Sequence, residues 1–259
     1  MIALVGSAGT VSATTPVTVT HTTAAGNLLV ALCSRTSATD VFTTVTDTAG
    51  NTWTPAVVAP TSGSVGRRVE IWYCANAASI TSLSAAFSGA APGAVTLHEF
   101  SGAATASVVD ASFGKVQTGT TTPTAAQVTP TQADDLVIGL IRANAGGAQT
   151  YTLNAGSYTA ITVPIAEHHG IAYQVGPTSG VATGPTWTLG TSVGSGSATV
   201  AFKVAATPPT SGAVKHWNGS AWVDANATTP VKYWNGSTWV APPAGKIKTW
   251  TGSTWDVAL

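Results

Sequence analysis

The sequence predicts an all-β protein: a β-sandwich of jelly-roll type, internally duplicated, followed by a small module of three tryptophan-rich β-hairpins. Three observations predict this fold class. Ala, Thr, Val, Gly and Ser dominate the chain, whereas Met, Glu and Lys are scarce, which favours strands over helices. Short apolar runs alternate with clusters of Gly, Pro, Asn and Ser over the first 205 residues. One ten-residue phrase then occurs three times near the C-terminus.

Composition excludes several classes of partner. Only 8% of the 259 residues are charged, and ten basic side chains balance ten acidic ones. Such a chain has no strong field to attract nucleic acid or an anionic lipid surface, so we expect neither partner. A hydrophobic content of 44% and nine tryptophans supply enough apolar surface to offset the entropy of folding.

The apolar runs predict twelve strands in the body, and no window has convincing helical periodicity. The predicted strands are Val17–His21, Asn27–Cys33, Phe42–Thr46, Thr52–Val58, Arg68–Cys74, Ser82–Phe87, Val95–Phe100, Asp135–Ile141, Tyr158–Val163, Gly170–Val175, Thr186–Leu189 and Ala198–Val204.

The two halves of the body resemble one another. The matching phrases are AGNLLVALCSR and ADDLVIGLIRA, RRVEIWYCANA and HHGIAYQVGPT, and GAVTLHEFSG and SATVAFKVAA. They are offset by 108, 101 and about 103 residues, as loops of different length would produce. Repetition of one strand order predicts two sheets or two Greek keys that share a core, and therefore a single sandwich rather than two independent domains.

Cys33 and Cys74 both lie in apolar strands, where cysteine usually behaves as a small buried hydrophobe. A disulfide between them remains open if the two strands are neighbours. Two thiols are too few for a cysteine-based zinc site.

The C-terminal part separates from the body by composition. We predict a body over residues 1–207, a linker over 208–213 and a repeat module over 214–259. The phrases VKHWNGSAWV, VKYWNGSTWV and IKTWTGSTWD begin at residues 214, 231 and 247. Each has the pattern of a hairpin whose turn is Asn-Gly or Thr-Gly, and Asn-Gly readily adopts positive φ at both central turn positions.

The tryptophan array is the most promising contact surface. Two tryptophans flank each turn and could pack across it, or their indole faces could stack on sugar rings while the turn asparagines donate hydrogen bonds. Six tryptophans exceed what so small a module can bury, which favours contact with a partner. The candidate contact residues are Trp217, Trp222, Trp234, Trp239, Trp250, Trp255, Asn218 and Asn235.

No catalytic, metal or cofactor motif is recognisable in the sequence. The five histidines follow no metal-binding spacing, and His168 and His169 would point to opposite faces of a strand. Asp134 and Asp135 would diverge in the same way, and no motif combines them into a carboxylate pair with Glu70, Glu99, Asp110 or Glu167. Gly-x-Ser-x-Gly occurs once, as GTSVG at residues 190–194, in a Gly- and Ser-rich stretch typical of a turn, and phosphate-binding loops do not occur. We therefore expect a protein that is not an enzyme and that needs no cofactor.

The N-terminal segment MIALVGSAGTVSATT lacks the basic start and the long apolar core of a signal peptide. No stretch approaches the roughly 20 apolar residues of a membrane span. We expect no membrane insertion, and a protein that either stays in the cytoplasm or is assembled there into something later released.

The VKxWNGSxWV repeats resemble the C-terminal repeats of minor tail and related virion proteins of phages that infect actinobacteria. The body, through GNLLVAL, VTDTAGNTWT, IWYCANA and LHEFSGA, resembles β-sandwich modules of phage structural and bacterial surface proteins. The third repeat departs from the pattern at Thr251 and Asp256. The resemblance implies a non-enzymatic virion protein that is displayed on the tail or on the capsid, and it supplies no catalytic residues.

We therefore expect a minor tail protein that acts in tail assembly or host attachment. Its expected partners are other virion proteins, two further copies of itself in a homotrimer, and host envelope glycans. The alternatives are a capsid decoration protein and a bacterial carbohydrate-binding surface protein. Sequence does not separate tail from capsid.

Overall fold

The computed structural model contains two compact units, Met1–Ala205 and Ala206–Leu259. All regular structure in the described residues is β-strand, and no helix occurs among them. The same residues thus contain no helix long and apolar enough to cross a lipid bilayer. The described residues are 1–37, 39–58, 67–89, 92–145, 149–164, 169–205, 215–217, 222–224, 233–234, 237–240, 248–250 and 255–257.

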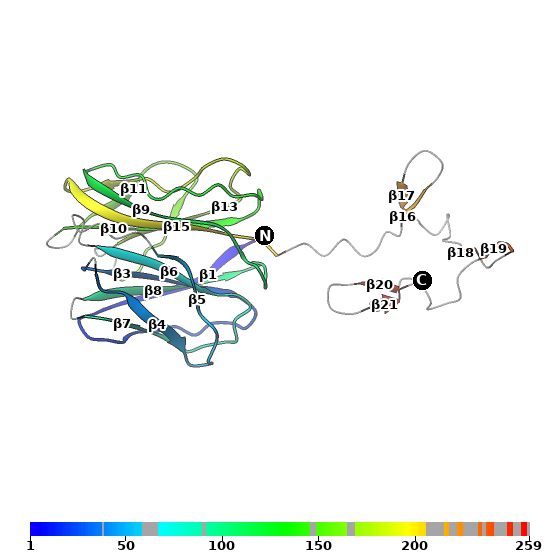
Figure 1. Cartoon of the computed structure of the whole chain (residues 1–259), viewed down its shortest axis with the longest axis horizontal. Coiled ribbons are helices and arrows are strands. Elements are labelled where there is room, and N and C mark those ends of the chain that lie inside the picture. Colours follow the sequence, from blue (N-terminus) through cyan, green and yellow to red (C-terminus); the bar gives the residue numbers. More distant parts are fainter. Residues whose placement is uncertain are drawn as a thin grey trace. The chain divides into compact units, whose positions relative to one another are not determined.

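The first half of the body consists of eight strands in two antiparallel sheets (Figure 1). The larger sheet has the order β1-β8-β3-β6-β5, and the smaller has the order β2-β7-β4. The strands are β1 (Ala3–Ser12), β2 (Val17–Thr20), β3 (Leu28–Arg35), β4 (Phe42–Asp47), β5 (Thr54–Val58), β6 (Arg68–Cys74), β7 (Ser82–Phe87) and β8 (Gly93–Ser101).

The second half repeats this arrangement with seven strands. Its larger sheet has the order β12-β13-β10-β15-β9, and β11 pairs with β14 in its smaller sheet. The bridges from Thr124 to Thr186 and from Val128 to Thr183 occupy the place that β2 has in the first half. The strands are β9 (Val109–Thr120), β10 (Leu136–Ala143), β11 (Tyr151–Leu153), β12 (Thr159–Ala160), β13 (Gly170–Val175), β14 (Trp187–Leu189) and β15 (Val193–Phe202).

Each half has the nested strand pairing of a jelly roll. In the first half β1 pairs with β8, β2 with β7 and β3 with β6, so that early strands pair with late ones. In the second half β9 pairs with β15 and β10 with β13. This nesting arises when one long hairpin rolls up into two facing sheets. The predicted all-β fold class is confirmed.

Strand register corrects two of the offsets between the halves. Tyr73 lies opposite Val30, and Tyr173 lies opposite Ile138, so these tyrosines correspond at an offset of 100 residues rather than 101. Phe100 and Phe202 lie opposite Leu28 and Leu136, which gives 102 rather than about 103. The error of one residue matters because side chains alternate between the two faces of a sheet.

A β-bulge recurs at the same place in both halves. The register between β1 and β8 shifts between Leu4 and Gly6, which leaves Val5 as the extra residue. The register between β9 and β15 shifts in the same way and leaves Asp110 as the extra residue. A bulge at matching positions is a strong sign of duplication, because bulges are specific features that related structures preserve.

The large sheets of the two halves face one another, and each also packs against its own small sheet (Figure 1). Side chains of β3 alternate between these two cores. Leu28, Val30 and Leu32 belong to the core that both halves share, whereas Leu29, Ala31 and Cys33 belong to the core of the first half alone. In β10, Leu136, Ile138 and Leu140 likewise enter the shared core.

Two aromatic pairs join the halves reciprocally. The ring centroids of Tyr73 and Phe202 are 5.7 Å apart, and those of Tyr173 and Phe100 are 5.8 Å apart, both in edge-to-face geometry. Because Tyr73 corresponds to Tyr173 and Phe100 to Phe202, each half offers the other the same contact. This reciprocity is typical of an isologous interface, here formed within one chain.

Three strands of the body were not predicted. β1, β9 and β11 were missed, and the strand expected over Tyr158–Val163 is limited to Thr159–Ala160. β1 and β9 are edge strands of the two large sheets, and their sequences are rich in Gly, Ser and Thr. An edge strand buries less of its surface than a central strand, so its sequence need not contain a continuous apolar run. Prediction from apolar runs therefore does not detect it.

Cys33 and Cys74 are buried free thiols. Their strands are neighbours, but Cys33 lies opposite Glu70 and Cys74 lies opposite Leu29. Four residues therefore separate the two cysteines along the strand direction, which corresponds to about 13 Å. Disulfide geometry requires Cα atoms within about 7 Å, so this register excludes the bond.

We predict that the two halves unfold together, because they share one core. Phe100→Ala and Phe202→Ala should each lower the free energy of unfolding by about 3–5 kcal/mol. Phe113→Ala, at a side chain that is 53% exposed, should change it by less than about 0.5 kcal/mol. Urea denaturation followed by far-UV circular dichroism should show one body transition in all variants; separate transitions for the halves would contradict the shared core.

Candidate functional site

Three antiparallel strand pairs hold the candidate tryptophans. In each pair the two tryptophans are direct Cα partners: Trp217 with Trp222, Trp234 with Trp239, and Trp250 with Trp255. Directly opposed residues of such a pair belong to the same face of the ribbon. The pairs are β16 (Lys215–Trp217) with β17 (Trp222–Asp224), β18 (Tyr233–Trp234) with β19 (Trp239–Val240), and β20 (Lys248–Trp250) with β21 (Trp255–Val257).

The other predicted elements of the repeat module lie outside the described residues. These are Asn218, Asn235 and the linker at 208–213. For the six tryptophans, the structure describes the backbone pairing alone. The strands predicted on either side of each turn are therefore present, and the turn geometry and the ligand contacts remain predictions.

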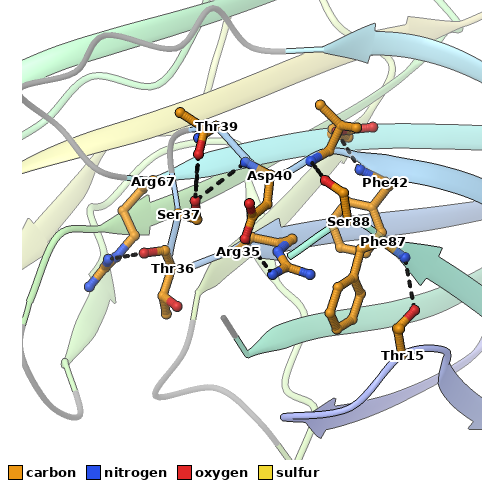
Figure 2. A network of polar contacts seen from close by, with 12 residues as sticks. Thr15, Arg35, Thr36, Ser37, Thr39, Asp40, Phe42, Arg67, Phe87 and Ser88 are labelled. Atoms are coloured by element: carbon orange, nitrogen blue, oxygen red, sulfur yellow. Dashed lines mark hydrogen bonds and ion pairs between the residues drawn. The ribbon is translucent and has the colours of Figure 1, made fainter. Parts of the chain in front are cut away.

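A buried ion pair stabilises one end of the first jelly roll (Figure 2). The Arg35 guanidinium is fully buried, donates to the Asp40 carboxylate at 2.8 Å and lies 3.6 Å from the centre of the Phe87 ring. The Phe87 amide in turn donates to Thr15 Oγ1 at 3.0 Å. The carboxylate and the aromatic ring together compensate a cation that has no access to water.

Asp47 organises the loop between β4 and β5. Its carboxylate accepts hydrogen bonds from the backbone amides of Ala49 and Asn51 and from the Asn51 and Trp53 side chains. Burial by itself would raise the pKa of Asp47, but these hydrogen bonds outweigh it and lower the pKa. Every donor comes from the same loop, so the arrangement is a local structural device.

Asp110 and Asp135 form a carboxyl pair that sequence reasoning missed. Asp110 accepts hydrogen bonds from the backbone amide and the hydroxyl of Thr131. Asp135 is fully buried, and neither of its side-chain oxygens has a well-aligned donor among the described residues. Burial raises the pKa of Asp135 to about 7, and the Asp110 carboxyl adds to this rise. Asp134, by contrast, is exposed.

The duplication contained a signal for this pair. Asp135 corresponds to Asn27 in the first half, and Asp110 corresponds to the bulge residue Val5. Two acidic residues thus replace a neutral amide and an apolar side chain at positions that the fold brings together. Comparison of the halves at the corrected register would have singled them out.

The described histidines do not gather into a metal-binding group. His98 is buried, with Nδ1 2.8 Å from Ser7 Oγ and Nε2 2.8 Å from Thr96 Oγ1. Burial, followed by the neighbouring His21, lowers the pKa of His98 to about 3, so this ring is neutral at physiological pH. No group of three metal-ligating side chains occurs in the part of the chain that the structure describes. His168 lies outside that part.

Ser34 and His169 form a hydrogen-bonded pair across the two halves. Ser34 Oγ lies 3.0 Å from Nδ1 of His169, and Arg142 Nη1 donates to the same oxygen at 2.9 Å. A serine beside a histidine is the minimal arrangement of an activated nucleophile. Ser34 is fully buried and His169 is 2% exposed, so a substrate has no access to this hydroxyl in the observed structure.

Comparison with known proteins supplies no relative for either unit. No protein-family model, curated protein or solved structure matches the chain significantly.

We predict that Asp40→Asn destabilises the body by about 3 kcal/mol, because it removes the carboxylate that compensates the buried charge of Arg35. Arg35→Met should cost less, since an apolar side chain of similar volume suits the site. Thr39→Ala, at an exposed neighbour, is the matched control. Urea denaturation at pH 7 measures all three; an Asp40→Asn variant as stable as wild type would show that the ion pair contributes nothing.

We predict that Asp135 makes the body less stable as pH rises. A carboxyl whose pKa is raised from 3.8 to about 7 on folding binds its proton more tightly in the folded state. Stability should therefore fall from about pH 4 to pH 7 and stay low above that range. Asp135→Asn should remove this decline and stabilise the protein at pH 8, whereas exposed Asp134→Asn should leave the slope unchanged. Melting temperatures across this range test the slope; equal slopes in wild type and Asp135→Asn would refute the assignment.

Proposed function

We propose that this chain is a non-enzymatic structural protein of a bacteriophage particle. Within the particle, the proposed role is that of a minor tail protein, which acts in tail assembly or in attachment to the host surface. The observation that carries the proposal is the threefold repetition of one strand pair that opposes two tryptophans. Three such units follow a β-sandwich that has its own core.

The repeat favours binding over a purely internal role. Each strand is only two or three residues long, so each unit has little core of its own. Tryptophan supplies a large, rigid apolar face with a polar N–H group, which suits contact with sugars and with other proteins. Several weak sites on one chain gain strength by acting together, and a homotrimer would increase their number further.

The body suits the role of a carrier. Jelly rolls occur both in viral capsid proteins and in lectins, and they present loops and edges on a rigid scaffold. The same fact keeps the two alternatives open: a capsid decoration protein, and a bacterial carbohydrate-binding surface protein. Immunogold labelling of intact particles distinguishes tail from capsid, and absence of the protein from purified particles would favour the bacterial alternative.

We predict that the full-length protein sediments with actinobacterial cell envelopes and that Trp217→Ala, Trp234→Ala and Trp250→Ala together abolish this binding. Each substitution removes one tryptophan from an opposed pair. Far-UV circular dichroism and the melting temperature of the body establish that the triple variant is folded.

The matched control replaces three exposed apolar side chains of the body, Val58, Phe113 and Val181, by alanine. This control should bind as wild type does. Envelope binding that survives in the tryptophan variant would remove the tryptophan array as the contact surface. Absence of binding by wild type would contradict attachment and favour a purely architectural role in tail or capsid.

A further inference from the structure

Arg142 is a buried cation without a counter-charge among the described residues. It lies in β10, and the residue is 5% exposed. In the described part of the chain, the guanidinium makes one hydrogen bond, from Nη1 to Ser34 Oγ at 2.9 Å, and its enclosed Nε has no acceptor. A single neutral hydroxyl is poor compensation for a charge that has lost its water.

The other arginines of the body show what this site lacks. Arg35 is paired with Asp40 and packs on an aromatic ring, and Arg68 is paired with Glu70. Arg67 donates to the backbone oxygens of Thr36, Ala143 and Ala145. Among the described residues, Arg142 has neither a carboxylate nor a set of carbonyl oxygens.

Burial is the main reason that the guanidinium of Arg142 is destabilised. Burial lowers the pKa of Arg142 to about 10; Tyr151 opposes this change and the nearby Arg67 adds to it, and the guanidinium remains charged at neutral pH. A carboxyl such as Asp135 can escape an unfavourable site by taking up a proton. A guanidinium has no such escape under these conditions, so its charge has to be compensated from elsewhere.

Hydrogen bonds connect the polar groups around Arg142. Ser34 Oγ accepts a hydrogen bond from Arg142 and lies 3.0 Å from Nδ1 of His169. The Ser34 hydroxyl can therefore donate its own proton in a hydrogen bond to that nitrogen. Tyr151 Oη accepts from the Ala143 amide at 2.9 Å. These contacts hold the guanidinium between the two halves, beside Arg67, which is half-buried and supplies a side of the cluster nearer to solvent.

We propose that Arg142 is the centre of an anion-binding site between the two jelly rolls, which takes one small oxyanion of phosphate or sulfate size. The unbonded Nε–H and the adjacent N–H groups of a guanidinium form a planar fork that matches two oxygens of such an ion. Arg67 adds favourable charge without giving up its own carbonyl partners. The site goes beyond the proposed virion role and does not depend on it.

One alternative to an external anion is a carboxylate of the chain itself. Glu167 is two positions from His169 in the sequence and is outside the described residues. If its carboxylate compensates Arg142, the site needs no external anion. The Glu167→Gln variant separates these possibilities.

The test is binding of inorganic phosphate, and separately of sulfate, to the full-length protein. Isothermal titration calorimetry at pH 7 should show saturable binding of one ion per chain. Thermal unfolding should show a saturable rise in melting temperature of roughly 3–6 °C at ten times the Kd, relative to sodium chloride at equal ionic strength.

Arg142→Met should abolish both signals, and Arg142→Lys should weaken the affinity at least about tenfold because lysine lacks the planar fork. Lys115→Met removes one positive charge elsewhere on the body and should bind phosphate as wild type does. If Arg142→Met does not fold, the calorimetry on wild type and Arg142→Lys decides by itself. No saturable binding by wild type, equal binding by Arg142→Met, or binding acquired only by Glu167→Gln would overturn the proposal.

Discussion

Burial of both faces of the central strands β3 and β10 in two five-stranded sheets is the constraint on which the rest of the body depends. Each large sheet packs on its own small sheet and on the large sheet of the other half, so every residue of β3 and of β10 is buried. In the sequence, such strands are continuous apolar runs instead of alternating apolar and polar residues. Neither half could expose the inner face of its large sheet to water without losing the core that it shares with the other half.

The same constraint determines how polar residues are tolerated. Arg35 and Glu70 are buried in the first half, and each has a partner of opposite charge. Asp135 has the nearby Asp110 carboxyl instead, and burial, followed by this neighbour, favours the protonated form of Asp135. Arg142 reaches across to Ser34 and so ties one half to the other. Duplication has thus preserved the packing of the two jelly rolls while their buried polar groups diverged.

The two units of the chain place their tryptophans differently, and this difference suits the proposed component of a particle. The body buries Trp53 and Trp187 inside its cores. The C-terminal unit places tryptophans in short repeated strand pairs that have almost no length over which to build a core. Under the proposed function, the first unit provides rigidity, and the second provides several equivalent contacts whose combined strength exceeds that of each one.

Sequence by itself determined the all-β class, the central strands, the internal duplication and the three strand pairs of the repeats. These features depend on local patterns: apolar runs, turn residues and repeated phrases. Only the tertiary structure decided the register between Cys33 and Cys74, the meeting of Asp110 with Asp135, and the isolation of Arg142 from the carboxylates of the described residues. Each of these depends on which strands become neighbours and at what offset, and a shift of one residue moves a side chain to the opposite face of the sheet.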